Sequence, residues 1–442
     1  MKFFRSLYIS PRFFAVLVGI IVVFILGFSF PFLVGLGQML VMALLLLLLL
    51  DLLLLYKQSA VTAQRICAEK LSNGDDNEIL IRLKNDYNFS IDVSVIDEIP
   101  HQFQLRNFLF KEHLHAGQEK TLQYFLRPVR RGEYEFGSIN VYVNTVLGLF
   151  VRRYEADKSK IVKVYPSYLQ LRKYELYAIS NRLTELGIKK IRKIGLQQEF
   201  EQIKEYVQGD DLRTINWKAT ARKNNLMTNQ YTDEKAQHVY SVIDKGRVMK
   251  MPFKGMTLLD YAINSSLVIS NIAIQKSDKA GIITFNTKIS TLLAADNKQG
   301  QMTKVLENLY NQKTAYQESD YEALFMTLRT QLKQRSLVLL YTNFEGLASL
   351  ERQISYFKGI AKQHLLVVIF FENTELKTLL DSRPTDNEEV YTKAIAQKFA
   401  YEKRLVVREL AKYGIHAILT APENLTVNTI NKYLELKARN LI

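Results

Sequence analysis

The sequence is short of cysteine and histidine, and these shortages exclude several classes of protein. Its single cysteine, Cys67, cannot form an intramolecular disulfide, so a reducing compartment fits better than an oxidising one. Its six histidines are scattered, and the close pair His113 and His115 supplies too few ligands for a metal site. The sequence therefore predicts neither a disulfide framework nor a histidine metal centre.

Recognisable catalytic motifs are also missing. The chain has no G-x-x-x-x-G-K-[ST] phosphate-binding loop, no H-E-x-x-H zinc motif and no cluster of cysteines. We therefore expect a protein that acts by binding and not as an enzyme, and we expect no cofactor.

The chain does have a high apolar content and a strong positive charge. Its 442 residues are 48% apolar and 11% aromatic, enough for two or three domains with separate cores. The net charge of +15 would permit contact with anionic lipid or nucleic acid. A solvated basic surface explains this charge as well, so we expect no nucleic acid partner.

Charge is absent from the longest apolar run. Residues 13–50 include no charged side chain, and the run continues to Tyr56 with only Asp51 interrupting it. One helix of this length would measure roughly 60 Å, about twice the hydrocarbon thickness of a bilayer. Pro31 breaks the run, because proline lacks the amide donor and clashes with the preceding turn.

The apolar run thus predicts a membrane segment at residues 1–56 with two transmembrane helices, at about 13–30 and 33–56. A cleavable signal peptide would have a shorter apolar region and a small-residue cleavage site. Asp51 is expected near the cytoplasmic end of the second span, in a structural role and not in an ion path.

Basic residues on both sides of the run predict its orientation, because lysine and arginine resist translocation. The connecting stretch between the two spans carries no charge, so both chain ends, and residues 57–442, are expected in the cytoplasm. The basic residues are Lys2, Arg5 and Arg12 before the run, and Lys57, Arg65 and Lys70 after it.

Residues 60–165 change to a period of two, which is typical of half-buried strands. Examples are the alternating apolar residues of 79–83, 93–95 and 139–143, separated by turn sequences such as SNGDDN and HAGQ. This region predicts a small all-β sandwich.

Residues 236–442 alternate between short apolar runs and amphipathic helical stretches. The runs HVYSVID, AGIITF, SLVLLYTNF, LLVVIFFE and HAILTAP read as buried strands of a parallel sheet that is covered on both faces. The pattern predicts a doubly wound α/β domain. Ligands of such sheets bind at the carboxyl ends of the strands, which directs attention to Asp244 at the end of the first run.

Between these two domains lies a linker, residues 166–235, whose segment 205–226 we call the signature segment. It resembles the bacterial family catalogued as domain of unknown function fifty-eight, which has a Gly-Asp-Asp-x-Arg-x-Ile-x-Trp-Lys-x-x-Ala-Arg signature. The matching residues are Gly209, Asp210, Asp211, Arg213, Ile215, Trp217, Lys218, Ala221 and Arg222.

The resemblance implies an architecture and a set of partners. Members of the family have two N-terminal spans, a β-rich segment and a von Willebrand factor A-like α/β domain. They also resemble products of gene neighbourhoods that encode MoxR-type AAA+ ATPases and other A-domain proteins. The resemblance therefore implies a non-enzymatic adaptor or scaffold in the bacterial cytoplasmic membrane.

The signature segment also has an explanation from local physics. Asp210 or Asp211 could cap a following helix, Arg213 could stack on Trp217 four residues later, and Arg222 would lie in the last turn. Asn224 and Asn225 could then end the helix in a left-handed conformation. The alternative is that the segment is an interaction surface, to which the exposed Lys218 contributes.

The resemblance to A domains raises the question of a divalent metal at Asp244. Such domains bind the ion through Asp-x-Ser-x-Ser, but here Gly246 and Val248 replace both serines, and Lys245 and Arg247 add positive charge. We therefore expect a degenerate site that holds no metal, with Asp244 acting as a cap or as a partner for the nearby lysine.

Two other functions remain open at this point. One is a metal-dependent hydrolase, which would require Asp210, Asp211 and Asp244 to converge. The other is an adhesion module that faces the cell envelope, which the opposite membrane orientation would favour.

Overall fold

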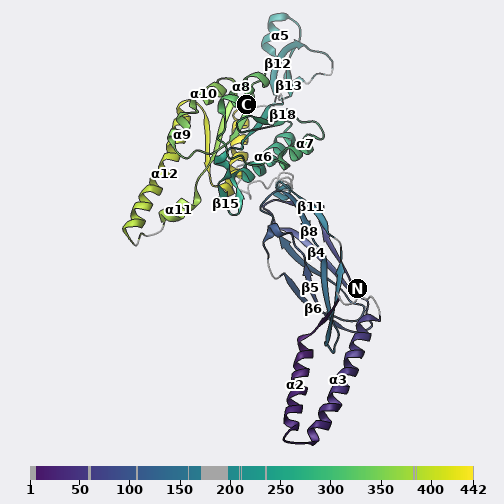
Figure 1. Ribbon diagram of the computed structural model, residues 1–442. Helices are drawn as coiled ribbons and strands as arrows, with labels where there is room; N and C mark the ends of the chain where they lie inside the picture. The colour runs from purple at the N-terminus through teal and green to yellow at the C-terminus, as the bar shows by residue number, and fades with distance from the viewer. Residues whose placement is uncertain are drawn as a thin grey trace. The chain divides into compact units, whose positions relative to one another are not determined.

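The computed structural model describes residues 6–57, 61–105, 108–157, 159–170, 198–208, 210, 212–233, 236–381, 384 and 386–441. The chain divides into two compact units, Met1–Tyr165 and Pro166–Ile442 (Figure 1). The sequence predicted the membrane segment and the sandwich as separate parts, whereas both belong to the first unit.

Two apolar helices form a helical hairpin at the start of the first unit: α2 (Pro11–Gly27) and α3 (Phe32–Tyr56). Pro11 at the first position of α2 and the Ser10 cap explain where that helix begins. The helices approach closely at Gly37, where an added Cβ would come within 2.9 Å of the Phe24 ring.

Only α3, among the described residues, is long and apolar enough to cross a membrane. It has 25 residues, whereas α2 is apolar but has 17. Two apolar helices are therefore present where two transmembrane helices were predicted, but only α3 is long enough to be a candidate span.

Three sheets make up the rest of the first unit (Figure 1). They share one apolar core. Their strand orders are β1-β10-β9-β5-β6, β2-β4-β7 and β3-β11-β8. The strands are β1 (Leu7–Ile9), β2 (Val61–Cys67), β3 (Lys70–Ser72), β4 (Asn77–Asn85), β5 (Ile91–Asp97), β6 (Leu109–Leu114), β7 (Glu119–Leu126), β8 (Gly132–Phe136), β9 (Ile139–Asn144), β10 (Phe150–Ala156) and β11 (Lys160–Tyr165).

The sandwich begins earlier than the predicted residue 60. Strand β1 precedes the helical hairpin and pairs antiparallel with β10, with Leu7 opposite Arg152. Leu55, in the last turn of α3, is fully buried in the sandwich core. The helical hairpin and the sandwich therefore fold as one domain and not as two independent ones.

The second unit is built on a six-stranded sheet of order β18-β17-β14-β19-β20-β21. The five predicted strands are all present and parallel, but the antiparallel edge strand β18 was missed. The strands are β14 (His238–Asp244), β17 (Lys279–Phe285), β18 (Ile289–Asp296), β19 (Leu337–Tyr341), β20 (Leu365–Phe371) and β21 (His416–Thr420).

Helices cover both faces of this sheet, as a doubly wound α/β fold requires. One core joins the sheet to α6 (Leu258–Gln275), α7 (Gln301–Tyr310) and α13 (Leu425–Ala438). The other joins it to α8 (Tyr321–Gln331), α9 (Leu347–Glu351), α10 (Ile354–Gln363) and α12 (Asn387–Lys412). Smaller elements are β15 (Pro252–Phe253), β16 (Met256–Thr257) and α11 (Thr374–Asp381).

Candidate functional site

The carboxyl edge of the parallel sheet is the first candidate site, and Asp244 is its fully buried centre. Oδ1 of Asp244 accepts hydrogen bonds from the backbone amide of Gly246, at 2.8 Å, and from the hydroxyl of Ser319. Oδ2 accepts from the Tyr321 hydroxyl at 3.0 Å and from Thr342 Oγ1 at 2.7 Å. Each carboxylate oxygen therefore has two donors.

Hydroxyls from more distant parts of the chain, those of Ser319, Tyr321 and Thr342, surround Asp244 in place of the two absent serines. Gly246 stands where a serine was expected, and an added Cβ there would collide with the Ser319 hydroxyl. The glycine thus makes room for Ser319 to reach Asp244. The prediction that Asp244 pairs with the nearby lysine is wrong. Its hydrogen-bond donors in the described part of the chain are three hydroxyls and one backbone amide.

Burial raises the pKa of the Asp244 carboxyl above its usual value, and the hydrogen bonds from Ser319, Gly246 and Thr342 oppose that shift. Burial, followed by the negative charge of Asp244, raises the pKa of Tyr321 well above its usual value. The network is therefore a set of mutually dependent polar groups with little access to solvent. Its four donors engage both carboxylate oxygens, so a metal ion could bind only if a hydroxyl turned away.

A pocket of about 70 Å³ lies beside Asp244. Charged side chains of both signs line it, Arg247 and Arg352 together with Glu318 and Glu345. It has room for a small polar group rather than for a cofactor.

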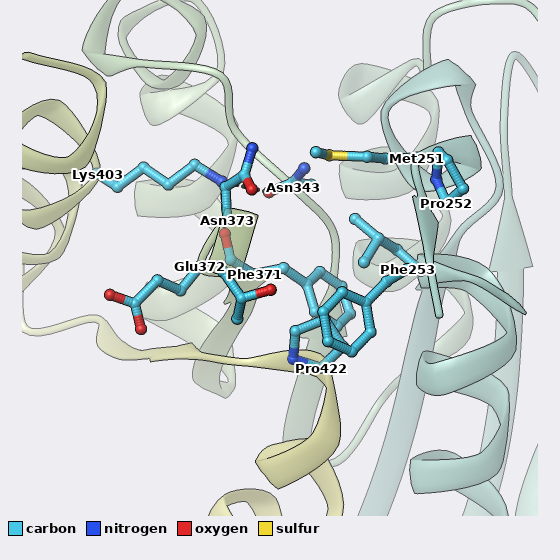
Figure 2. Close-up of a pocket in the computed structure, with 11 residues that line it drawn as sticks. Met251, Pro252, Phe253, Asn343, Phe371, Glu372, Asn373, Lys403 and Pro422 are labelled. Carbon is cyan, nitrogen blue, oxygen red and sulfur yellow. Dashed lines mark hydrogen bonds between the residues drawn. The ribbon is translucent and has the colours of Figure 1, made fainter. Parts of the chain in front are cut away.

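A second, smaller pocket surrounds Lys403 of α12 (Figure 2). The Lys403 amine donates to Asn343 Oδ1 at 3.2 Å and to the carbonyl oxygen of Phe371. Met251 and Phe253 lie across the pocket from this amine (Figure 2). The pocket encloses about 20 Å³, enough for about one water molecule.

Burial lowers the pKa of Lys403 to about 8, and the charges of Glu372 and Glu345 act in the opposite direction. An amine with this pKa is partly neutral near physiological pH and could in principle accept a proton. The small enclosed volume favours a structural role instead, in which Lys403 ties α12 to the ends of β19 and β20.

The signature segment lies in an antiparallel hairpin of β12 (Gln198–Glu205) and β13 (Met227–Asp233). Between these strands come a 3₁₀ turn, Leu212–Thr214, and the short helix α5 (Trp217–Lys223). Gly209 and Asp211 lie outside the described residues, as does the side chain of Arg213. The predicted stacking of Arg213 on Trp217 therefore stays a prediction.

The predicted cap by Asp210 is wrong. Asn216 caps α5, and its side chain accepts from the amide of Ala219 at 3.0 Å. Asp210 instead pairs with Lys204 at 3.0 Å and accepts from the amide of Val207 at 3.1 Å. The acids are followed by a 3₁₀ turn before the helix begins, so Asp210 stands too early in the chain to cap it.

The end of α5 agrees with the prediction. Arg222 lies in the last turn, and Asn224 has the left-handed conformation expected of a terminating residue, with φ of 58°.

The hydrogen bond from Lys204, followed by that from the Val207 amide, lowers the pKa of Asp210 below its usual value.

Large apolar side chains are exposed around this turn, which a capped helix alone does not explain. Trp217, the only tryptophan in the chain, is 70% exposed. Val207 and Leu212, ten and five residues before it, are exposed as well, and so are the basic residues Lys218 and Arg222 of α5. We call these five residues the tryptophan patch.

Of the three carboxylates predicted for a hydrolase, the structure describes Asp210 and Asp244, and these two share no hydrogen-bond partner. Asp211 lies outside the described residues. Within the described residues, no group of three or more His, Cys, Asp or Glu side chains could hold a metal ion.

Comparison with known families finds one match in the second unit. The model of the family "Protein of unknown function DUF58" matches residues 202–388. A curated relative, the "Uncharacterized protein YeaD" of Bacillus subtilis (strain 168), is 27% identical over 127 residues, which is 28% of this chain and 31% of that protein. The chain thus matches about a third of the length of this relative.

Two solved structures with remote likeness to the chain are BatB and an alpha-2-macroglobulin. The conserved hypothetical protein BatB from Bacteroides thetaiotaomicron is 14% identical with a TM-score of 0.31, and the match covers 46% of this chain and all of that one. Native alpha-2-macroglobulin from Escherichia coli is 17% identical with a TM-score of 0.21, over 24% of this chain and 16% of that structure. TM-scores this low carry no argument about fold or function.

Proposed function

We propose that this protein is a membrane-anchored scaffold that binds a protein partner through its second unit. The observation that carries the proposal is the tryptophan patch. Binding hot spots typically combine a tryptophan with apolar and basic residues. A partner that covers the exposed ring removes a large apolar surface from water, which favours binding.

The construction of the first unit supports retention of the helical hairpin as an anchor. A cleaved signal sequence contributes nothing to the mature fold, whereas here α3 supplies Leu55 to the sandwich core, and β1 pairs with β10. Basic residues on both sides of the hairpin favour a cytoplasmic location for residues 57–442 in a bacterial membrane.

The second unit is proposed to act as an A-like domain that binds without a metal or a catalysed reaction. The saturated hydrogen bonding of Asp244 supports this, since its oxygens are already engaged. By resemblance to the family, the partner we propose is a MoxR-type AAA+ ATPase, together with other A-domain proteins, and not nucleic acid.

The test is a titration of the full-length protein, in nanodiscs, with a purified MoxR-type ATPase from the same genome. We expect Trp217→Ala to weaken binding at least about tenfold, as for an aromatic hot spot. Lys218→Glu should weaken it a few-fold at low salt, where surface charges act most strongly.

Matched controls separate the patch from general effects of the substitutions. Met326→Ala removes an exposed apolar side chain from α8, and Lys288→Glu makes the same charge change elsewhere on the second unit. Binding by Trp217→Ala and Lys218→Glu as tight as that of the two controls would refute the proposal.

A further inference from the structure

The loop between β9 and β10, residues 145–149, lies against the helical hairpin instead of at a free edge of the sandwich. We call it the base loop. The Thr145 hydroxyl donates a hydrogen bond to Oδ1 of Asp51 in α3. The amides of Leu149 and Phe150 donate to Oδ2 of Asp51, at 3.0 and 2.8 Å. One buried carboxylate thus fixes both ends of the loop to the helix.

Apolar packing extends the base loop along the hairpin. Leu149 is buried in a small cluster with Ile20 of α2 and Leu44 of α3. Phe13 and Leu48 pack around this cluster. The loop therefore shares its apolar contacts with the helices that are proposed to lie in the bilayer.

The end of α3 indicates how deep the loop reaches. The carbonyl oxygen of Leu55 accepts from the Tyr87 hydroxyl at 2.7 Å and from Arg152. The guanidinium of Arg152 also lies over the ring of Tyr56, 4.3 Å from its centre. Tyrosine and arginine in this arrangement are typical of the membrane-water interface. Asp51 lies five residues deeper, about 7 Å closer to the hairpin turn.

The tip of the base loop is apolar and exposed. Val146 is 76% exposed, although it follows Thr145, which contacts the buried Asp51. The loop turns at Gly148, which has φ of 62°, and an added Cβ there would come within 2.6 Å of the Arg12 guanidinium. Arg12 is itself exposed, so a cation lies next to an apolar loop tip.

We propose that the base loop inserts Val146 into the lipid interface, so that the sandwich is seated on the membrane beside its anchor. The proposal rests on the membrane anchoring proposed above. Insertion removes apolar surface from water at the depth where peripheral apolar segments are stabilised, and it places Arg12 near lipid phosphates. The satisfied amides of Leu149 and Phe150 lower the cost of placing this part of the loop there.

The experiment uses single-cysteine variants of the full-length protein in a Cys67→Ser background, each labelled with an environment-sensitive fluorophore. The protein is placed in phosphatidylethanolamine–phosphatidylglycerol nanodiscs with or without lipids that carry a nitroxide quencher in the acyl chain. The labelled positions are Val146→Cys at the loop tip, Leu46→Cys in α3 and Phe125→Cys in β7.

The two reference positions were chosen because their side chains, like that of Val146, are largely exposed. Leu46 is 66% exposed and lies within the proposed span, while Phe125 is 57% exposed on the same sandwich. The start of β7 lies close to the end of α3 through two strand pairings. Glu119 is opposite Lys84 in β4. The next residue of β4, Asn85, is opposite Val61, where β2 begins after α3. Phe125 lies about 20 Å further along this strand, away from the helix.

We expect quenching at position 146 to be at least about threefold stronger than at position 125 and to approach that at position 46. Quenching at 146 equal to that at 125, with position 46 strongly quenched, would overturn the proposal and leave the anchor intact. Weak quenching at all three positions would overturn the anchor, and the inserted loop with it.

Discussion

A fully buried aspartate ties neighbouring segments together within each unit, and the two sites differ in their hydrogen-bond donors. Asp51 in α3 accepts hydrogen bonds from one hydroxyl and two backbone amides, whereas Asp244 in β14 accepts from three hydroxyls and one amide. Both carboxylates are fully buried. The difference matters because a hydroxyl can rotate towards another acceptor, whereas a backbone amide cannot turn without moving the chain.

A buried acid can therefore organise loops without a cation partner among the described residues. At Asp51 the acid joins a helix to a loop whose backbone would otherwise lack acceptors. At Asp244 it joins the ends of strands to Ser319, Tyr321 and Thr342. We expect the first arrangement to tolerate substitution less well than the second.

The largest effect is expected for Asp51→Leu, which suits an apolar helix but leaves the amides of Leu149 and Phe150 without their acceptor. We expect a loss of about 3–5 kcal/mol in the free energy of unfolding of the first unit. The measurement is denaturant unfolding in detergent micelles, with Leu46→Ala as a control on the exposed face of α3. An Asp51→Leu protein as stable as the control would show that water replaces the carboxylate.

A smaller loss, about 1–3 kcal/mol, is expected for Asp244→Ala, because its hydroxyl donors can reorient towards each other. Tyr321 and Thr342 already lie 2.7 Å apart, oxygen to oxygen. Asp244→Asn keeps the shape and should cost less than the alanine variant. If the two substitutions proved equally costly, the hydrogen bonds would not be the source of the stability.

The same pair of variants tests the charge of Asp244. Its folded pKa is raised, so the folded state holds this proton more tightly than the unfolded state. The wild-type stability should therefore fall as the pH rises from about 4 through the folded pKa. Asp244→Asn should lack this slope, and unfolding curves across that pH range measure it. Parallel pH profiles for the two proteins would contradict the assignment.

Lys403 is a cation at the same sheet edge. We expect its titration to change the free energy of unfolding by less than the substitutions at Asp244 do. Its folded pKa of about 8 lies below the ordinary value, so the folded state releases this proton more readily. Stability should rise as the pH increases from about 8 to about 10.4, by about 1–2 kcal/mol after allowing for partial exposure. Lys403→Met should remove this rise, and Lys398→Met on the exposed face of α12 should retain it.

The smallest expected effect is that of divalent ions. Because both oxygens of Asp244 already accept two hydrogen bonds, millimolar Mg²⁺ or Mn²⁺ should leave the melting temperature of the wild type unchanged. Calorimetric titration should likewise show no saturable heat. A dissociation constant below about 1 mM that disappears in Asp244→Ala would show that the hydroxyls reorient to admit an ion.

Much of the framework was predictable because single stretches of sequence determine it. The uncharged run of residues 13–50 has no alternative to apolar helices, and Pro31 supplies the break between them. The five parallel strands appear as continuous apolar runs. Strand β18 was missed because its residues alternate between half-buried and exposed, as expected for an antiparallel edge strand covered on one face.

The candidate sites were harder to predict because their parts are distant in the chain. Ser319 and Thr342 lie 75 and 98 residues after Asp244, so only the order of strands in the sheet brings them together. Lys403 lies within a long helix whose pattern gives no sign of a buried amine. In the signature segment, the choice of Asn216 as the cap depended on a 3₁₀ turn that separates it from the acids.

Strand β1 also constrains the order of events during synthesis. The partner of Leu7 in the sheet, Arg152, is made 145 residues after it. At translation rates of about 5–20 residues per second, this delay is about 7–30 seconds. Residues 11–56 are made within that interval, so on the membrane anchoring proposed above the apolar hairpin would meet the bilayer while β1 still lacks its neighbour. The pairing of β1 with β10 would then close beside an anchor already in place.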